Sequence, residues 1–296
     1  VLTAQDILGA TQPQKVAASE QLASAKRNFE VGTQTITDTH EAQAAYDLVV
    51  AQEFAAINDL ANKRSASQTI ICEAPTSLAP MRTGVVISAP EPAAIEPWVS
   101  SAEEQNYGVV TAQFNVESAK RDIGRNRAGH YPTLDLIANT GHSYTSGGGN
   151  GSGNNNNAIG VQWSIPIFSG FAVTSKVRES IALENKARND LETARRTASQ
   201  GARQAFLGVN SGLAQVKALE AAEVSSKSAL ESNQLGYQVG VRINIDVLNA
   251  QKQLFSTQKD LSKARYDTIM NGLRLKAAAG TLKETDLMPV NALLDK

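Results

Sequence analysis

The chain has 296 residues, a net charge of −1 and 5% aromatic residues. The balanced charge leaves no electrostatic footprint for nucleic acid, and the single cysteine, Cys72, excludes an internal disulfide or a paired-cysteine metal site. The sequence has no run of 18 apolar residues, which excludes a transmembrane helix, although membrane-crossing β-strands would leave a much weaker pattern.

Residues 1–64 carry two helical patterns separated by a short turn, and we expect them to be the end of a helical hairpin. Val1 to Leu8 reads as a helix already under way, without Met or a signal-peptide pattern, so we expect an earlier part of the protein to precede it. Gly32 in the turn fits a helix-ending residue with positive φ. Asp38, with Glu41 three residues later, fits a capping box at the start of the second helix.

The next part of the chain, residues 65–98, is irregular and proline-rich, and we expect a mixed segment there. Helical patterns follow at about 93–104 and 107–127. We therefore expect residues 99–129 to form a helix that leads into the strands that come next.

Residues 130–168 contain two strand patterns, 130–144 and 158–168, each long enough to cross a bilayer as a tilted strand. Residues 145–157 between them are almost wholly Gly, Ser and Asn, which is typical of an exposed loop. An ordinary hairpin packed on a soluble core explains the same periodicity, so both interpretations stay open. Because open sheet edges are not tolerated in lipid, a transmembrane hairpin would need other copies to close a barrel. The face expected to meet lipid consists of Ile159, Val161, Trp163, Ile165 and Ile167.

Residues 169–281 predict a second, much longer helical hairpin. No proline occurs between Pro166 and Pro289, which permits a helix from about Ala172 to Gln238 and a return helix from about Ile245 to Ala279. A helix that long needs partner helices along its whole length. Residues 282–296 are expected to form a C-terminal segment.

Several residues of this second hairpin predict how its helices pack. In the return helix apolar residues recur every seven positions from Val247, with Leu248 and Phe255 beside them. This spacing indicates a seam that faces a partner helix continuously. Three glycines in the first helix indicate either close helix approach or local weak points. The spaced residues are Val247, Leu254 and Leu261, and the glycines are Gly201, Gly208 and Gly212.

An internal repeat relates the two hairpins. Residues 29–38 (FEVGTQTITD) match residues 237–246 (YQVGVRINID) in their aromatic, Val-Gly, β-branched and Asp positions, and each copy lies between two helical patterns. The chain therefore contains one arrangement twice: a long helix, a Val-Gly turn and a second long helix.

In this order the motifs resemble the TolC family of outer-membrane efflux and type I secretion ducts. The likeness rests on residues 129–136 (GHYPTLDL), 163–170 (WSIPIFSG), 264–267 (ARYD) and 276–282 (KAAAGTL) together with the repeated turns. The resemblance implies a mainly α fold with a small β part: antiparallel coiled-coil helices form an α-barrel, and the transmembrane hairpin contributes to a trimeric β-barrel. Such a subunit donates four strands to a twelve-stranded barrel, whereas this sequence supplies only two, which would give six in a trimer.

The family also implies the surroundings of the protein. It would be a homotrimer in the outer membrane of a Gram-negative cell, in contact with outer-membrane lipid and extending into the periplasm. A mixed equatorial belt, to which residues 65–98 and 282–296 would belong, would surround its tunnel. Its partners would be a periplasmic adaptor (a membrane fusion protein) and an inner-membrane transporter, and it would conduct exported proteins or small molecules. No nucleic acid, cofactor or metal is expected.

The resemblance assigns roles to the two turns. They would form the periplasmic mouth, where Tyr237 and Arg242 reach Asp38 and Thr37 and hold it closed. Asp246 would face the narrow lumen as an anionic ring, and the position one turn later, often a second aspartate in the family, is Asn249. The turns would also dock the adaptor through Val31, Gly32, Val239 and Gly240. Alternatives stay open, because Asp38 also suits a helix cap and Arg242 a solvated loop charge.

Three hypotheses compete. The first is a passive export channel energised by a separate pump. The second is a soluble periplasmic coiled-coil adaptor or scaffold, which leaves the alternating strand without a purpose. An enzyme is the third, and it lacks support because His40, His130 and His142 are scattered and no catalytic motif occurs. The sequence does not identify the cargo, the pump or the adaptor.

Overall fold

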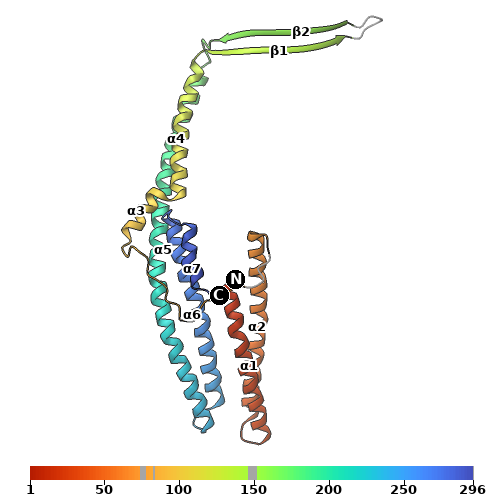
Figure 1. Cartoon of the computed structure of the whole chain (residues 1–296), viewed down its shortest axis with the longest axis vertical. Coiled ribbons are helices and arrows are strands. Elements are labelled where there is room, and N and C mark those ends of the chain that lie inside the picture. The colour runs from red at the N-terminus through yellow and green to blue at the C-terminus, as the bar shows by residue number, and fades with distance from the viewer. Residues whose placement is uncertain (74–77, 83, 146–151, 296) are drawn as a thin grey trace. The chain divides into compact units, whose positions relative to one another are not determined.

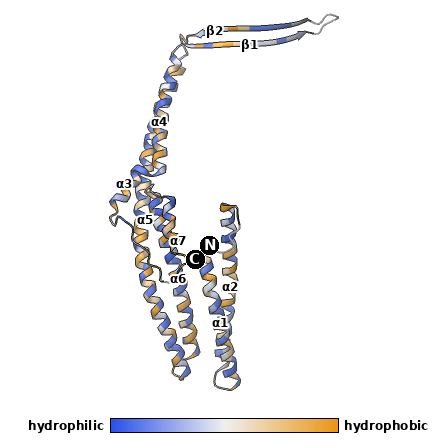
Figure 2. Ribbon diagram, viewed as in Figure 1, coloured by the Kyte–Doolittle hydropathy of each residue, from blue (hydrophilic) through white to orange (hydrophobic). Residues whose placement is uncertain are grey.

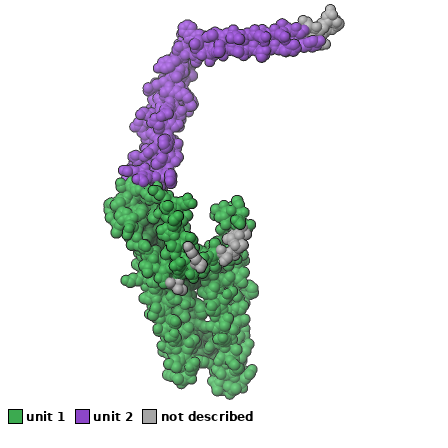
Figure 3. Space-filling view, viewed as in Figure 1, with its two compact units in different colours: residues 1–102, 199–296 green, residues 103–198 purple. Residues whose placement is uncertain are grey.

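The computed structural model describes the chain except residues 74–77, 83, 146–151 and 296 (Figure 1). The described residues form a mainly α fold with one two-stranded antiparallel sheet, as the sequence predicted. They divide into two compact units, residues 1–102 with 199–296 and residues 103–198 (Figure 3). The helices are α1 (Leu2–Glu30), α2 (Ile36–Ile71), α3 (Glu96–Gln105), α4 (Tyr107–Arg127), α5 (Ala172–Gln238), α6 (Asn244–Ala278) and α7 (Leu287–Ala292), and the strands are β1 (Thr133–Thr145) and β2 (Ser152–Ser164).

In the first unit α1 and α2 form a hairpin that packs through small residues at a seven-residue spacing. A seven-residue repeat keeps the same face of a helix against its neighbour over many turns. Small side chains let the two helices approach closely, and hydrophilic and hydrophobic residues are interspersed along both helices (Figure 2). The buried seam residues are Ala4, Thr11, Ala18 and Ala25 in α1, and Ala42, Val49 and Ala56 in α2.

The later part of α5 and α6 form a second hairpin in the same unit, and the predicted heptad seam is confirmed. The seam of α6 continues past the predicted residues to Thr268 and Leu275, each only 1% exposed. The buried residues are Ala202, Val209 and Val216 in α5, and Val247, Leu254, Leu261, Thr268 and Leu275 in α6.

The three glycines of α5 play different parts. A Cβ on Gly212 would lie 2.4 Å from Thr268 Oγ1, and one on Gly208 would lie 3.2 Å from Asn271 Nδ2. These two glycines therefore allow α6 to approach closely, as one of the two interpretations held. Gly201 has nothing within 4 Å of an added Cβ, so it is a local weak point.

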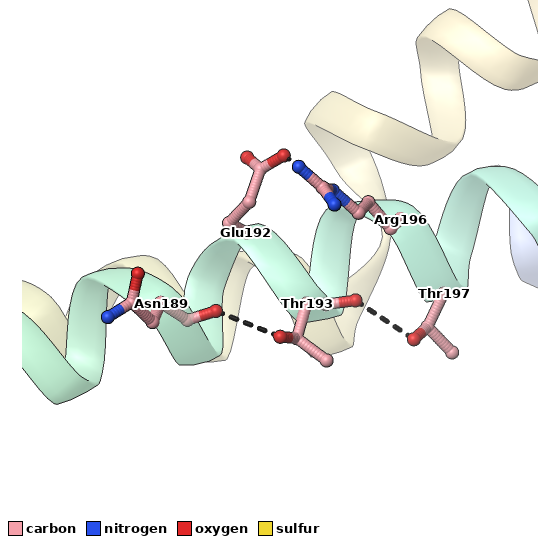
Figure 4. A network of polar contacts seen from close by, with 5 residues as sticks. All are labelled: Asn189, Glu192, Thr193, Arg196 and Thr197. Carbon is pink, nitrogen blue, oxygen red and sulfur yellow. Dashed lines mark hydrogen bonds and ion pairs between the residues drawn. The ribbon is translucent and has the colours of Figure 1, made fainter.

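The exposed face of α5 around residues 189–197 is polar, and its polar side chains bond to groups on the same helix. Arg196 Nε lies 2.8 Å from Glu192 Oε1, and the hydroxyls of Thr193 and Thr197 donate to backbone oxygens one turn earlier (Figure 4). Exposed pairs of this kind contribute only about 0.3–0.5 kcal/mol each. Their main effect is that this face needs no protein partner to satisfy its polar groups.

The mixed segments that flank the hairpins meet in the first unit. Residue Met81 pairs with Leu294 as an isolated antiparallel bridge, and Lys276 Nζ lies 2.8 Å from Asp286 Oδ1. Trp98 packs with Phe206 and Leu275. One expectation was wrong: residues 65–71 are not irregular but continue α2, because no glycine or proline interrupts the helix before Cys72 ends it with a φ of 58°.

In the second unit α4 meets the start of α5, where a Cβ on Gly129 would lie 3.3 Å from Val173 Cγ1. The hairpin follows, with Thr133 opposite Ser164 and Thr145 opposite Ser152. Among the described residues, no helix combines the length and the apolar character needed to cross a membrane.

The first strand begins at Thr133 and not at residue 130 as predicted, because residues 128–130 form a 3-10 turn. The second strand differs from its predicted bounds at both ends. Residues 152–157, expected in the loop, belong to β2, so only 146–151 of that loop remain and they lie outside the described residues. The asparagines extend the strand because they bond across it: Thr140 Oγ1 donates to Asn157 Oδ1 at 2.7 Å. At the other end Ile165 and Ile167 lie beyond β2, since Pro166 has no N–H to donate to a strand ladder.

Candidate functional site: the helical turns and the strand hairpin

The two repeated turns have the same backbone structure. Gly32 and Gly240 have φ angles of +77° and +78°, the left-handed region that favours glycine. In both turns the glycine N–H donates to the aromatic residue three positions earlier, Phe29 O at 3.0 Å and Tyr237 O at 3.1 Å. The internal repeat is therefore a structural repeat at the level of individual hydrogen bonds.

Four turn residues were expected to dock an adaptor, and all four are exposed. Val31 is 72% exposed and Val239 is 65% exposed. An added Cβ on Gly32 or Gly240 would meet nothing within 4 Å. Both tips therefore present open backbone beside an exposed valine.

Tyr237 connects the second turn to the first, but through partners that the sequence did not indicate. Its hydroxyl accepts hydrogen bonds from Gln34 Nε2 at 2.5 Å and from Asn28 Nδ2 at 3.4 Å. The expectation that Tyr237 bonds to Asp38 is not met within this chain. The contact is between neutral groups, so it carries no Coulomb attraction.

Asp38 instead caps its own helix. Its Oδ2 accepts from the backbone N–H of Thr35 at 3.0 Å and from Thr35 Oγ1 at 2.7 Å, and its own N–H donates to Thr35 Oγ1 at 3.3 Å. The capping box therefore begins at Thr35, one turn before the predicted pair of Asp38 and Glu41. The hydroxyl and the backbone N–H of Thr35, the N-cap residue of α2, are the donors to this carboxylate, which explains its orientation.

Arg242 is likewise occupied within its own turn. Its Nη1 lies 3.7 Å from Asp246 Oδ2, one helical turn further on. Among the described residues, no hydrogen bond joins Tyr237 or Arg242 to Thr37 or Asp38. The structure thus brings the two turns together but does not form the expected pairs within one chain. Asp38 bonds to Thr35 at the N-cap of α2, and Arg242 in the second turn lies 3.7 Å from Asp246 at the start of α6.

Asn244, which the sequence analysis missed, makes the most buried polar contact between the turns. It is 1% exposed, its Oδ1 accepts from Gln21 Nε2, and its Nδ2 donates to the backbone oxygen of Asp38 at 3.5 Å. Its position three residues before Val247 was the available signal, since residues at that spacing share a helix face. The side chain therefore ties α6 to both helices of the first hairpin.

Beyond this contact, α6 and the first hairpin enclose two hollows. One has a volume of about 400 Å³ and the other about 190 Å³, and Gln14, Gln52 and Lys252 line both. Asn249 borders the smaller hollow and does not bond to Asp246. Apolar side chains such as Ile7, Leu48 and Leu248 line the hollows together with these polar ones. The boundary between the two hairpins is therefore less closely packed than the buried seam within each hairpin.

A second polar cluster joins α1 to the middle of α6. Asp6 Oδ2 accepts from Ser262 Oγ at 3.0 Å and from the Tyr266 hydroxyl at 2.8 Å. Burial, and then the hydrogen bond to Asp6, raise the pKa of Tyr266. The phenol therefore stays protonated and remains a donor to the carboxylate.

The strand hairpin has one apolar and one polar face over its first five residue pairs. Leu134 lies opposite Trp163 and Leu136 opposite Val161, and all four side chains are 68–76% exposed. Ile159 continues this face and is 84% exposed. The other face is mainly polar, with Thr133 opposite Ser164 and Asp135 opposite Gln162, and it also carries Ile137 opposite Gly160. Towards the loop both faces become polar (Figure 2).

The described part of the chain has no group of three or more His, Cys, Asp or Glu side chains that would hold a metal ion. The site therefore consists of surfaces and hydrogen-bonded turns.

Comparison with known proteins decides the family. The sequence profile of the family described as outer membrane efflux protein matches residues 98–281. The chain belongs to this family. As a family member it is 36% identical over 296 residues to the outer membrane protein TolC of Vibrio cholerae, with 99% of this chain and 68% of that protein covered.

Two further comparisons support the same family. The chain is 32% identical over 300 residues to the alkaline protease secretion protein AprF of Pseudomonas aeruginosa, covering 98% of this chain and 61% of AprF. Its fold matches the CmeC outer membrane channel of Campylobacter jejuni with a TM-score of 0.78 at 17% identity, covering 99% of this chain and 64% of CmeC. The chain thus spans roughly two thirds of these proteins' length. The relatives are named as outer membrane and secretion proteins rather than as enzymes.

Proposed function

We propose that this chain is the greater part of a subunit of an outer-membrane export channel in a Gram-negative cell. The subunit conducts exported proteins or small molecules through a β-barrel in the outer membrane and an α-helical tunnel in the periplasm. The observation that carries the proposal is the hairpin of β1 and β2, which exposes Leu134, Val161, Trp163 and their neighbours on one face and polar groups on the other.

That hairpin suits a lipid boundary better than water. A soluble protein rarely exposes a continuous row of large apolar side chains, whereas barrel strands alternate between lipid and a polar lumen. Both strands also have an unpaired edge among the described residues, and lipid does not tolerate unpaired backbone. Further strands, from other copies and from the rest of the subunit, complete the barrel in a homotrimer.

The packing of the two helical hairpins supports the proposed α-helical tunnel. Each helix buries one narrow seam, and large apolar residues such as Phe54, Leu207 and Val224 stay 61–68% exposed outside it. Neighbouring subunits cover these side chains when the hairpins assemble into a cylinder. The same exposure in an isolated monomer would favour aggregation.

The turns form the periplasmic end of the tunnel in this proposal. Val31, Gly32, Val239 and Gly240 provide the open backbone and exposed valines that dock a periplasmic adaptor, which links the channel to an inner-membrane transporter. Thr37, Asp38, Tyr237 and Arg242 contribute to keeping the mouth closed, with their bonds to neighbouring copies added to those within the chain. Asp246 and Asn249 line the constriction.

Single-channel conductance in a planar bilayer tests the function. The full-length protein is compared with a Tyr237→Phe, Arg242→Ser double variant and with a Lys186→Ser variant on the exposed face of α5. We expect a small conductance for the wild type and the Lys186 control, and a severalfold larger conductance for the double variant.

The outcomes separate the parts of the proposal. Equal conductance in all three proteins would keep the channel and remove Tyr237 and Arg242 from the closed mouth. Absence of conductance from folded, inserted protein would overturn the channel. A full-length protein that stays monomeric and water-soluble without detergent would favour a periplasmic scaffold instead.

A further inference from the structure

We propose that the outer part of the strand hairpin, residues 139–145 of β1 with 152–158 of β2, binds the uncharged saccharide headgroups of glycolipids in the outer leaflet of the membrane. This inference deepens the proposed function, on which it rests, by naming a ligand class for the part of the hairpin that lies beyond the lipid chains. It is carried by a polar face, two side-chain amides and an exposed tyrosine on that face.

One face of the hairpin changes from apolar to polar along its length. Alternate residues of an antiparallel pair share a face, so the face that carries Leu134 and Trp163 continues to Ala138 opposite Ile159. Beyond that pair the same face carries polar and aromatic residues and one glycine. They are Thr140 opposite Asn157, His142 opposite Asn155, and Tyr144 opposite Gly153. The surface proposed to face lipid at the base of the hairpin therefore continues as a polar surface.

The length of the hairpin puts this polar part outside the hydrocarbon of the membrane. Large apolar residues alternate from Ile159 to Ile167, and about 9–11 residues of a tilted strand span the hydrocarbon. The seven residue pairs from 139 with 158 to 145 with 152 remain beyond that span. At a rise of about 3.3 Å per residue and a tilt of about 45°, they reach about 16 Å further, whereas a phospholipid headgroup layer is about 5–8 Å thick. Because α4 and α5 join the other end of the hairpin and lie in the periplasm in the proposed channel, this end reaches the saccharide layer outside the cell.

The composition of this part of the hairpin favours an uncharged ligand. Residues 139–145 and 152–158 contain no Lys, Arg, Asp or Glu. Proteins bind phosphate groups mainly through Arg and Lys, so a phosphate is a poor match for this surface. Asparagine amides both donate and accept hydrogen bonds, and the hydroxyl groups of a saccharide do the same. A neutral saccharide is therefore the chemical match.

Two asparagines on this face are oriented by their cross-strand neighbours. Thr140 Oγ1 donates to Asn157 Oδ1 at 2.7 Å, and Asn155 Oδ1 is hydrogen-bonded to His142 Nδ1. Each bond engages the amide oxygen, and within the described part of the chain neither Nδ2 group has a hydrogen-bond partner. Both side chains are exposed and lie two positions apart on β2, so their NH2 groups offer donors in a row along the strand. Side chains already held in place lose less conformational freedom when they bind a ligand.

Tyr144 supplies an aromatic surface beside these amides. A Cβ added to Gly153 would lie 3.7 Å from Tyr144 Cδ2 and 3.8 Å from His142 Cε1, so an edge of each ring lies within contact distance of the partner strand. Tyr144 nevertheless remains 68% exposed. Its ring offers an apolar surface to the C–H groups of a sugar ring, while the neighbouring amides bond to the hydroxyl groups. Tyrosine has few rotatable bonds, so it makes such a contact at a low entropic cost.

The test measures which lipids the full-length protein retains from mixed detergent micelles. The micelles contain equal amounts of digalactosyl diacylglycerol, which has an uncharged saccharide headgroup, and phosphatidylglycerol, which has an anionic phosphate and no sugar. After gel filtration, mass spectrometry measures the amount of each lipid bound to the protein. The variants are Tyr144→Ala, Tyr144→Phe and the double variant Asn155→Ala, Asn157→Ala. The matched control is the double variant Asn154→Ala, Asn156→Ala, which makes the same substitutions at neighbouring positions on the opposite face.

We expect the wild type to retain the glycolipid in preference to phosphatidylglycerol by about tenfold, since several hydrogen bonds and a ring contact favour the saccharide. Tyr144→Ala and the Asn155, Asn157 double variant should each lower that preference about fivefold to tenfold. Tyr144→Phe keeps the ring and should match wild type. The control on the opposite face should also match wild type.

Other results overturn the saccharide surface. Equal retention of the two lipids by the wild type, or a preference for phosphatidylglycerol, would show that the protein does not recognise the sugar. An equal loss in the control would show that this face has no particular role. Because the measurement is made in micelles, it does not depend on conduction. Retained glycolipid without single-channel conductance would reject the channel and keep this surface, and conductance without a glycolipid preference would do the reverse.

Discussion

Replacing Gly212 with alanine probes how closely α5 and α6 approach. The added Cβ would lie 2.4 Å from Thr268 Oγ1, which is closer than side chains tolerate, and 3.2 Å from Thr268 Cβ, which is tighter than most such contacts. Thr268 cannot move freely, because it is 1% exposed and its hydroxyl donates to Ala264 O at 2.7 Å. The substitution must therefore break that bond or push α6 away.

The expected change in the free energy of unfolding is the sum of opposing effects. Overpacking costs about 1–3 kcal/mol, and loss of the Thr268 bond costs about 1 kcal/mol. Alanine gains about 1 kcal/mol over glycine in a helix interior. We expect a net destabilisation of about 1–3 kcal/mol, whereas Gly201→Ala, with nothing within 4 Å, keeps only the helix gain.

Thermal unfolding followed by circular dichroism in detergent measures both variants. At about 2–4 °C per kcal/mol, Gly212→Ala should unfold several degrees below wild type and Gly201→Ala slightly above it. Adding Thr268→Ala to Gly212→Ala removes the clashing hydroxyl and should recover part of the loss. A rise in unfolding temperature for Gly212→Ala like that of Gly201→Ala would refute the close approach of the helices.

Three further predictions follow from the caps, the ion pairs and the hairpin. Thr35→Ala removes the hydroxyl of the α2 capping box and should cost about 1 kcal/mol, seen as faster hydrogen exchange in the first turn of α2 but not of α6; unchanged exchange would contradict the cap. The hydrogen bond from Lys276, and then that from the backbone N–H of Lys283, lower the pKa of Asp286. The stabilisation by this carboxylate is therefore complete above its ordinary pKa and is lost as the pH falls through the lowered value. Proteolysis of the C-terminal segment should increase below about pH 4 in wild type but show no such step in Asp286→Asn. Val161→Arg should cost about 2–4 kcal/mol per chain of insertion into lipid vesicles, while Asn156→Arg, nearer the loop and on the other face, should insert normally; equal insertion of the two variants would reject the lipid-facing assignment.

The long helices were predictable because their determinants are local and repeated. The absence of proline between Pro166 and Pro289 leaves the backbone of α5 free to stay helical, and its observed bounds match the predicted Ala172 and Gln238. The seven-residue spacing from Val247 likewise indicates a buried seam without reference to any partner. The Val-Gly repeat predicted both turns, since positive φ at Gly32 and Gly240 is a property of the residue itself.

The strand bounds show where local propensity stops being sufficient. Asparagine-rich residues 152–157 have a low intrinsic preference for strands, yet they pair with β1 because cross-strand bonds such as Thr140 to Asn157 compensate. Conversely, the alternation through Ile165 and Ile167 continues the apolar pattern past the point where Pro166 ends the ladder. Periodicity identifies which residues share a face, whereas pairing determines where the strand ends.

The sequence by itself determined the family, the two helical hairpins and their turns, because each depends on residues close together in the chain. Only the tertiary structure decided which side chains meet across the boundary between the hairpins. Asp38 and Arg242 had been expected to bond across it, but Asp38 bonds to Thr35 at the N-cap of α2 and Arg242 pairs with Asp246 at the start of α6. Asn244, an unremarked polar residue in the sequence, makes the buried contact instead, because the packing of α6 against the first hairpin removes it from water and leaves Gln21 and the backbone of Asp38 as its partners.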